Sequence, residues 1–469
     1  MNKFEHEGYW WLPEKPDKKI AGSLRFDPVE GAVLELIGSF KDLTKLGDVS
    51  NPDFVLGVAG GKAFTLYKCV ETNTRMNMNV GLPVTMVSTY FANVIFVGYH
   101  FAKEEDIVFE SITVNYSYLE QWVGISGIKF GFGTDKDKHL TKYDASYSFP
   151  EKITIRPGDF DLTITYAFRD GGDRLKHLEF VQTTLLEIKP KTPLSFDEYH
   201  RKFLYHLQNL LSLGVGRAVY PLEIKGKNSN CKTDLDKGKS ILNEIVICYR
   251  LGKLPDLKKK LHPLLDMFFC YSDISSHFEN CIRNWFAKAD LLSPVYDLYF
   301  ATLYNPAMYL QHEFLSLAQA IESYHRRVVG GEYVNREGYA PILKALTEAI
   351  PDGIEEGFRK SLEYRMQYLH EYSLMKRLKD LTNINNAVLV SGIKDKGVFV
   401  KDVCNTRNFL THYDKDLEDK AKKGNDLYKI TKQLQFLIEI CLLKELGIPD
   451  SDILKLTLRN QRYTHIQKL

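Results

Sequence analysis

The sequence lacks the cysteine patterns that define a metal-stabilised or disulfide-stabilised protein. Its cysteines are odd in number and include no Cys-x-x-Cys pair, which argues against a zinc ribbon and against a disulfide framework. The seven are Cys69, Cys231, Cys248, Cys270, Cys281, Cys404 and Cys441. Reduced, buried thiols in a cytoplasmic protein are the simpler account. No cluster of His, Asp or Cys has the spacing of metal ligands, so the sequence predicts no metal and no cofactor.

An excess of one charge is also absent. The chain has 62 Lys and Arg against 60 Asp and Glu, which is too balanced for nucleic-acid binding over the whole surface, so an RNA site must be local.

Glu5 and Glu7 lie where a signal peptide needs an apolar core, so we expect no export. Residues 76–102 contain no Asp, Glu, Lys or Arg and are long enough to span a membrane. Asn77, Asn79 and Pro83 interrupt the segment, and its β-branched and aromatic residues favour two buried strands, so we expect no membrane span.

The first half of the chain has the pattern of a β-rich domain. Residues 112–118 and 162–166 alternate apolar and polar side chains, which is typical of strands with one buried face. Gly, Pro and Asp turn signals separate many such runs between about residues 8 and 190, and they favour an antiparallel, sandwich-like fold. A mixed part with a helix followed by further strand-like runs covers residues 195–270. We therefore predict a β-rich domain over residues 1–270, with strands on both sides of this helix.

Two features of this domain admit a functional interpretation. Residues 57–63 look like a phosphate-binding loop, but the spacing is one residue short and Ala63 replaces the hydroxyl residue that holds magnesium, so we expect a hairpin turn. The cluster of Tyr9, Trp10 and Trp11 could form a platform on which sugars or bases stack. We favour packing of a first strand into the core instead.

The second half of the chain, residues 271–469, has helical periodicity. Residues 310–328 place apolar side chains at alternating steps of four and three, and residues 426–446 repeat this pattern before a Gly and Pro stop signal. A third helix is expected over residues 354–381. With a fourth helix that begins near Val400, these segments predict an all-α bundle with its core at about residues 305–447.

The fourth helix carries three groups that can cut RNA without a metal. They are the guanidinium of Arg407, the amide of Asn408 and the imidazole of His412, and the last two share one helix face because they lie four positions apart. Arg407 can bind a phosphate at any working pH, and His412 can exchange a proton near neutral pH. The same Arg-x4-His spacing begins at Arg365, so a surface Arg/His pair is the alternative interpretation.

These residues resemble the motif of a known family. The sequence Arg-Asn-x-x-x-His at residues 407–412 resembles the Arg-polar-x-x-x-His motif of HEPN-domain ribonucleases. Residues 8–13, with Gly-Ser-Leu at 22–24, resemble the N-terminal domain of ApeA-type anti-phage proteins, and residues 322–326 are a further likeness. The resemblance implies a helical HEPN bundle in which two subunits pair with adjacent motif helices. It therefore implies a homodimer or a higher even homo-oligomer.

The resemblance also implies roles for individual residues. His412 would exchange a proton with the ribose 2′-hydroxyl or the leaving oxygen, Arg407 would neutralise charge on the phosphate oxygens, and Asn408 would hold a phosphate oxygen or the imidazole. The products would be a 2′,3′-cyclic phosphate and a free 5′-hydroxyl. Two interpretations stay open for the residues before the motif: Glu322 and His325 support Arg407, or Glu322 belongs to a surface Glu/Arg pair three or four positions apart.

Contacts with RNA outside the motif are expected to be weak. Tyr413 could stack on a base or fill the bundle interior, and we expect the second. Small basic patches can bind phosphates, and the residues concerned are Lys420, Lys422, Lys423, Arg459 and Arg462. The expected substrate is a single-stranded RNA loop, such as one on a tRNA, because its ribose is free to align with the bond that breaks.

A second interpretation assigns no chemistry to the chain. In it the helical domain dimerises and recognises a nucleotide or a protein, while the β-rich domain binds a glycan or a phage component. Under the nuclease interpretation the β-rich domain senses a phage-derived trigger or restrains the nuclease, because an uncontrolled ribonuclease would poison its host.

Overall fold

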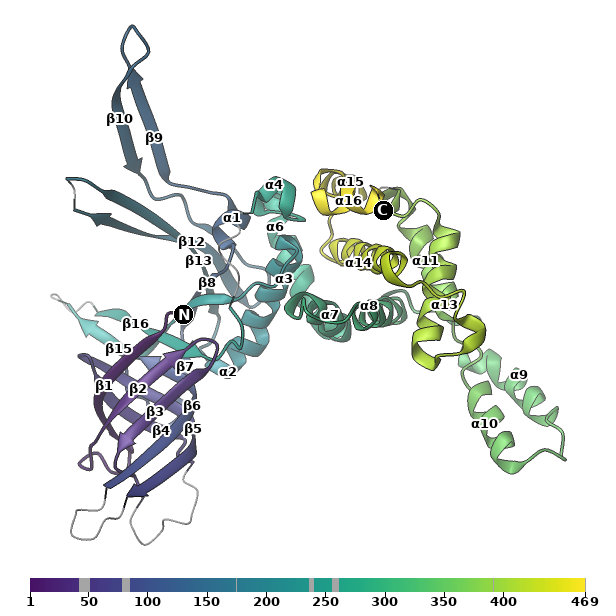
Figure 1. Ribbon diagram of the computed structural model, residues 1–469, viewed down its shortest axis with the longest axis horizontal. Coiled ribbons are helices and arrows are strands. Elements are labelled where there is room, and N and C mark those ends of the chain that lie inside the picture. Colours follow the sequence, from purple (N-terminus) through teal and green to yellow (C-terminus); the bar gives the residue numbers. More distant parts are fainter. Residues whose placement is uncertain are drawn as a thin grey trace. The chain divides into compact units, whose positions relative to one another are not determined.

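The computed structural model divides the chain into two compact units that interleave along the sequence (Figure 1). The first contains residues 1–211, 219–263 and 270–279, and the second contains residues 212–218, 264–269 and 280–469. The residues that the structure describes are 1–41, 51–77, 85–173, 175–235, 240–254, 261–390 and 392–468. A single boundary at residue 270 simplifies this division, because short segments on each side of it belong to the other unit.

The first unit is built around one antiparallel sheet. Its strands are β1 (Phe4–Trp11), β2 (Ile20–Asp27), β3 (Gly31–Ile37), β4 (Phe54–Ala59), β5 (Lys62–Asn77), β6 (Thr85–Val97), β8 (Ser111–Tyr116), β11 (Ile153–Ile155), β12 (Phe160–Gly172), β13 (Leu178–Pro190), β15 (Pro221–Asp234) and β16 (Ser240–Tyr249). They lie in the order β11-β12-β13-β8-β15-β16-β6-β3-β2-β1-β4-β5, and β5 also pairs with β6. The predicted β-rich class is confirmed, as is the contribution of strands from both sides of the helix after residue 195.

The second pairing of β5 closes strands β1 to β6 into a barrel, where the sequence predicted a sandwich. β6 makes this closure because both of its edges are used. One edge pairs with β5 from end to end, and the other pairs with β3 at residues 87–92 and then with β16 at residues 94–97. β6 thus belongs both to the barrel and to the sheet that continues through β16.

The barrel interior explains the aromatic cluster of the first strand. Trp10 is fully buried among apolar side chains such as Tyr90, and its Nε1 donates a hydrogen bond of 3.1 Å to the carbonyl oxygen of Gly22. Trp11 is also buried, whereas Tyr9 is exposed. Packing of the first strand into the core is therefore confirmed for the two tryptophans.

The segment that resembles a phosphate loop is the hairpin turn between β4 and β5, as predicted. The two strands pair up to Ala59 and Lys62. Gly60 and Gly61 between them have φ angles of 54° and 74°, which residues without a Cβ adopt at little cost.

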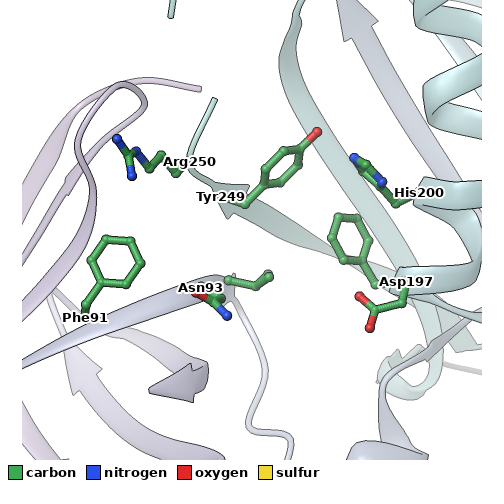
Figure 2. A pocket seen from close by; sticks show the side chains of 8 residues that line it. Phe91, Asn93, Asp197, His200, Tyr249 and Arg250 are labelled. Carbon is green, nitrogen blue, oxygen red and sulfur yellow. The ribbon is translucent and has the colours of Figure 1, made fainter. Parts of the chain in front are cut away.

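Smaller elements complete this half of the chain. They are the paired strands β7 (Val108–Phe109) and β14 (Leu194–Ser195), the hairpin of β9 (Ile128–Thr134) and β10 (Leu140–Tyr147), and the helices α1 (Leu119–Val123), α2 (Phe196–Tyr199), η3 (His200–Leu204) and α3 (Tyr205–Val215). A hollow of about 490 Å³ lies in the first unit, lined by residues from β6, α2, η3 and the end of β16 (Figure 2).

The remainder of the chain is helical, which confirms the predicted fold class of its C-terminal part. The helices are α4 (Pro263–Asp266), α5 (Tyr271–Ile274), η5 (Ser275–His277), α6 (Phe278–Ala287), α7 (Ala289–Tyr304), α8 (Leu310–Tyr324), η6 (His325–Val329), α9 (Arg336–Glu348), α10 (Glu356–Met366), α11 (Leu374–Ile384), α12 (Asn386–Leu389), α13 (Lys396–His412), η7 (Lys415–Leu417), α14 (Gly424–Glu445), α15 (Asp450–Arg459) and α16 (Gln461–Lys468). α14 is the most buried of the long helices, and α8 packs against it and against α7. In the part of the chain that the structure describes, no helix is both long enough and apolar enough to cross a membrane.

Two helices, α10 and α11, replace the single helix predicted over residues 354–381. The backbone between them bonds to another segment instead of continuing the helix. The carbonyl oxygen of His370 accepts a hydrogen bond of 2.7 Å from the amide of Tyr333, and the amide of Tyr372 donates one of 3.3 Å to Gly331. The amphipathic periodicity on both sides of this break hid it in the sequence.

Candidate functional site

The motif helix α13 begins and ends at identifiable residues. The side chain of Asp395 accepts a hydrogen bond from the amide of Val398, which caps the N-terminus. The first turns bury apolar side chains such as Phe399 and Val403 in the bundle. The helix ends at His412 because Tyr413 has a φ of 52°, in the left-handed region. The motif therefore occupies the last two turns of α13, beyond the part of the helix that is buried.

The guanidinium of Arg407 is held by a carboxylate on another helix. Its Nη2 lies 3.6 Å from Oε2 of Glu322, a residue of α8, and its Nη1 donates a hydrogen bond of 3.2 Å to Oδ1 of Asn408. The side chain of Arg407 remains 37% exposed. The expected pairing of Glu322 with Arg407 is thus present, and the guanidinium keeps a surface open to a ligand.

A second guanidinium shares the same carboxylate. Nη2 of Arg326 lies 3.8 Å from Oε1 of Glu322, and its Nη1 forms an ion pair with Glu371. A hollow of about 510 Å³ lies at this position, and it is lined by Leu315, Gln319, Glu322, Ser323, Arg326, Arg407 and Thr411. The sequence spacing of Glu322 and Arg326 signals a helix pair, but it does not show that the pair lies beside the motif helix.

His412 and Asn408 do not line this hollow. Both side chains are exposed, and Asn408 contacts the site through its hydrogen bond to Arg407. Five positions along an α-helix turn through about 140°, so Arg407 and His412 point in different directions from α13. Among the described residues His412 has no hydrogen-bond or ion-pair partner, which leaves its imidazole available to a ligand or to another chain.

Tyr413 does not fill the bundle interior, so the prediction for this residue was wrong. Its side chain is 68% exposed, and its ring meets that of Phe409 edge-on at 5.5 Å between centroids. The left-handed backbone at the end of the helix turns the side chain outward. An exposed ring beside the motif is available for stacking.

His325 is not a partner of Arg407, and this prediction was also wrong. The ring is fully buried at the start of η6, where its Nδ1 lies 3.1 Å from Nη1 of Arg377 and its Nε2 lies 3.5 Å from a carboxylate oxygen of Asp380. Burial, and next the positive charge of Arg377, lower the pKa of His325 below its ordinary value. The ring is therefore neutral at neutral pH and supports the bundle interior.

The basic segment before α14 adjoins the motif helix. The backbone amide of Lys422 donates a hydrogen bond of 2.9 Å to the hydroxyl of Thr406, and its Nζ lies 3.3 Å from Asp402. Lys423 pairs with Glu418 and lies over the ring of Phe409. Lys420 is exposed in the same segment. The expectation that these lysines contact RNA stays a prediction.

Arg462 forms an ion pair with a buried carboxylate, which competes with the expected contact to RNA. Its Nη2 lies 2.9 Å from each carboxylate oxygen of Glu439, which is only 1% exposed. Tyr299 donates a hydrogen bond of 2.7 Å to the same carboxylate, and Tyr463 also bonds to it. Arg459 is half-buried at the end of α15. The sequence shows only a run of basic residues and not the carboxylate that neutralises one of them.

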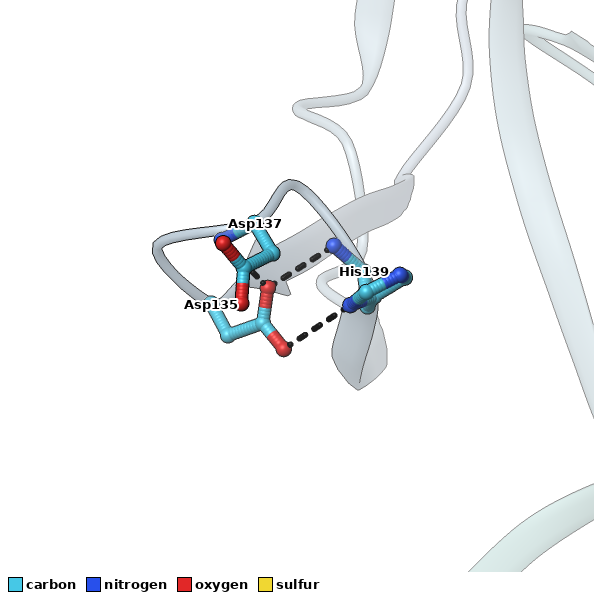
Figure 3. A group of neighbouring side chains, drawn as sticks. All are labelled: Asp135, Asp137 and His139. Carbon is cyan, nitrogen blue, oxygen red and sulfur yellow. Dashed lines mark hydrogen bonds and ion pairs between the residues drawn. The ribbon is translucent and has the colours of Figure 1, made fainter.

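One group of metal-ligand type residues escaped the sequence analysis. Asp135, Asp137 and His139 come together in the exposed turn between β9 and β10 (Figure 3). One carboxylate oxygen of Asp135 accepts hydrogen bonds of 2.9 Å from the amides of Asp137 and His139, and the other lies 3.3 Å from Nδ1 of His139. These bonds account for the turn, so we assign no ion to it.

Comparison with protein families assigns both halves of the chain to known domain families. The Apea-like HEPN family matches residues 315–452, so the helices that carry Arg407 and Glu322 form a HEPN domain, which is generally a ribonuclease fold. The ApeA N-terminal domain 1 family matches residues 5–285, more than half of the chain. The chain belongs to the ApeA family of HEPN-containing anti-phage defence proteins, and the resemblance noted in the sequence is confirmed. No curated protein and no solved structure matches it.

Proposed function

We propose that this protein is a metal-independent RNA endonuclease that acts in abortive anti-phage defence. The observation that carries the proposal is the arrangement on α13. An open guanidinium, Arg407, is held by Glu322 and Asn408 at a hollow, and an exposed imidazole, His412, lies little more than one turn further along the helix.

The reaction requires only groups that the chain supplies. The ribose 2′-oxygen attacks the adjacent phosphorus, and the bond to the 5′-oxygen breaks. The hydroxyl proton passes to a base, and a proton passes to the leaving oxygen. One His412 fills one of these two roles, which is worth roughly 10²- to 10⁴-fold in rate. Arg407 neutralises the charge that builds up on the phosphate oxygens. The products are a 2′,3′-cyclic phosphate and a 5′-hydroxyl.

The directions of Arg407 and His412 support a site shared between two chains. The two side chains point away from one another on a single helix, so one chain alone does not direct both of them at one phosphate. In a homodimer with adjacent motif helices, His412 of one subunit lies against Arg407 of the other, and each such pair forms one site. A single-stranded RNA loop, such as one on a tRNA, fits such a groove because its ribose is free to turn.

The first experiment compares variants of the full-length chain in an RNA cleavage assay with EDTA present. Arg407→Ala and His412→Ala should each reduce cleavage by at least about 100-fold, with melting temperature and oligomeric state unchanged. Arg365→Ala and His312→Ala are the controls, since both side chains are exposed on other helices. Absence of cleavage by the wild-type chain would favour the binding-module interpretation, and cleavage that survives both motif substitutions would place the active site elsewhere. Cleavage that needs added magnesium would contradict the mechanism.

A second experiment tests the shared site with the two inactive variants of the first. When Arg407→Ala and His412→Ala chains assemble at random, half of the dimers are mixed, and each mixed dimer has one intact shared site. Activity should therefore return to about one quarter of the wild-type value. No recovery in mixed dimers, with the wild type active, would place both residues of a working site on one chain.

A further inference from the structure

The hollow of the first unit has an apolar floor and a polar rim. Its volume is about 490 Å³, within the range of small-molecule sites of roughly 300–1,000 Å³. The floor consists of Phe91, Val94, Phe196 and Tyr249, which are buried or half-buried. The rim consists of exposed polar side chains, which are Asn93, Asp197, His200 and Arg250. Figure 2 shows Arg250 and Phe91 on one side of the hollow and Asp197 and His200 on the other.

The side that carries Arg250 is fixed by the turn between β2 and β3. Nε of Arg250 donates a hydrogen bond of 3.0 Å to the carbonyl oxygen of Val29, and the amide of Leu251 donates one of 2.7 Å to Pro28. This anchor leaves the two Nη groups of Arg250 available. Gly31, with a φ of 100°, lets the ring of Phe91 approach, because a Cβ there would lie 2.5 Å from it. The guanidinium and the ring are therefore held in place before any ligand binds.

The opposite side is fixed by the start of α2. Ser195 and Glu198 form a capping box, which sets the position of Phe196 and Asp197. The ring of His200 meets that of Tyr249 edge-on, at 5.8 Å between centroids. The carboxylate of Asp197 is exposed, and one of its oxygens lies 3.5 Å from Nζ of Lys68.

These features define the chemistry of a ligand. Aromatic rings at the floor offer a face on which a flat ring stacks. A guanidinium at one side binds a phosphate, and a carboxylate at the other side repels it but accepts hydrogen bonds from N–H groups. A nucleotide has this polarity, with a phosphate at one end and a base that carries N–H donors at the other. Guanine presents two neighbouring donors to a carboxylate, and uracil presents one.

We propose that the hollow lined by Phe91, Phe196, Asp197, Tyr249 and Arg250 binds a nucleoside monophosphate, with the base on Tyr249 and towards Asp197 and the phosphate on Arg250. Guanine nucleotides bind most tightly. This site is separate from the HEPN motif and gives the β-rich unit a ligand of its own.

Calorimetric titration of the full-length chain with GMP and UMP tests the proposal. GMP should bind with a Kd below about 1 mM, and more tightly than UMP. Tyr249→Ala and Arg250→Gln should each weaken GMP binding about tenfold or more. Asp197→Asn should remove the preference for GMP over UMP and should not affect folding, since the side chain is exposed. Guanosine and inorganic phosphate, titrated alone, should each bind more weakly than GMP.

Variants elsewhere supply the controls. Tyr9→Ala and Arg25→Ala remove an exposed ring and an exposed guanidinium of the same unit, and should leave GMP binding unchanged. Arg407→Ala should also leave it unchanged. The proposal is overturned if GMP does not bind, if Tyr249→Ala and Arg250→Gln chains with wild-type melting temperatures bind GMP normally, or if binding is lost only in Arg407→Ala, which would place the nucleotide at the HEPN motif.

Discussion

Replacing Arg462 by Met should destabilise the helical unit, because it leaves a buried carboxylate without its counter-charge. Glu439 is 1% exposed, and its carboxylate forms an ion pair with Arg462. It also accepts hydrogen bonds from three neutral side chains, those of Tyr299, Gln435 and Tyr463. Breaking a buried ion pair costs about 3–5 kcal/mol. Because Arg462 is 29% exposed and the neutral donors remain, we expect about 2–4 kcal/mol. For a unit of about 200 residues this lowers Tm by roughly 4–16 °C.

Thermal unfolding followed by circular dichroism measures this effect. Lys455→Met is the matched control, because its ion pair with Asp452 is exposed and should shift Tm by no more than about 2 °C. Adding Glu439→Gln to Arg462→Met removes the uncompensated charge, so the double variant should melt above the single one. The reasoning is refuted if Arg462→Met melts like the control, or if the double variant loses the sum of both single effects.

Three further predictions concern the motif region. Glu322→Gln removes the carboxylate shared by Arg407 and Arg326, so filter binding should show tighter binding of RNA at low salt. A thermal melt should show that Tm changes by only a few degrees. Weaker RNA binding would contradict this prediction. Arg326→Ala should raise KM for RNA more than it lowers kcat in steady-state cleavage, because we expect Arg326 to bind phosphate away from the bond that breaks; an effect on kcat alone would contradict this. Burial raises the pKa of the Cys404 thiol to about 11, so only about 0.1% of it is thiolate at pH 8. Alkylation of Cys404 by iodoacetamide, followed by mass spectrometry, should therefore be more than tenfold slower in the native chain than in urea. Equal rates would refute the burial of this thiol.

The sequence predicted the strands but not how the sheet closes. Alternating side chains along residues 112–118 and 162–166 identify β8 and β12, and the adjacent glycines Gly60 and Gly61 identify the turn before β5. Closure depends on β6, whose two edges pair with β3, β5 and β16. The partner β16 lies about 150 residues further along the chain. Periodicity records which face of a strand is buried, and it contains no information about which distant strand pairs with its edge.

The site was predicted only as far as local spacing allows. The motif on α13 and the acidic partner Glu322 were identified by their order in the sequence. The role of Arg326, the burial of His325 and the ion pair of Arg462 were missed. Each of these depends on a residue from another helix, and charged side chains that are buried with a partner look the same in a sequence as solvated ones.

The interior of the bundle explains why a common Glu-x-x-x-Arg pair becomes part of this site. Helix α8 continues directly into η6, and buried Arg377 donates hydrogen bonds to the carbonyl oxygens of Gly330 and Tyr372 as well as to neutral His325. These bonds fix η6 at both ends and therefore fix the turn that places Glu322 beside Arg326. On a free helix such a pair contributes about 0.2–0.5 kcal/mol and fluctuates. Here the carboxylate of Glu322 also lies 3.6 Å from Arg407, so a buried arginine outside the hollow supports the segment whose guanidinium shares that carboxylate with the motif.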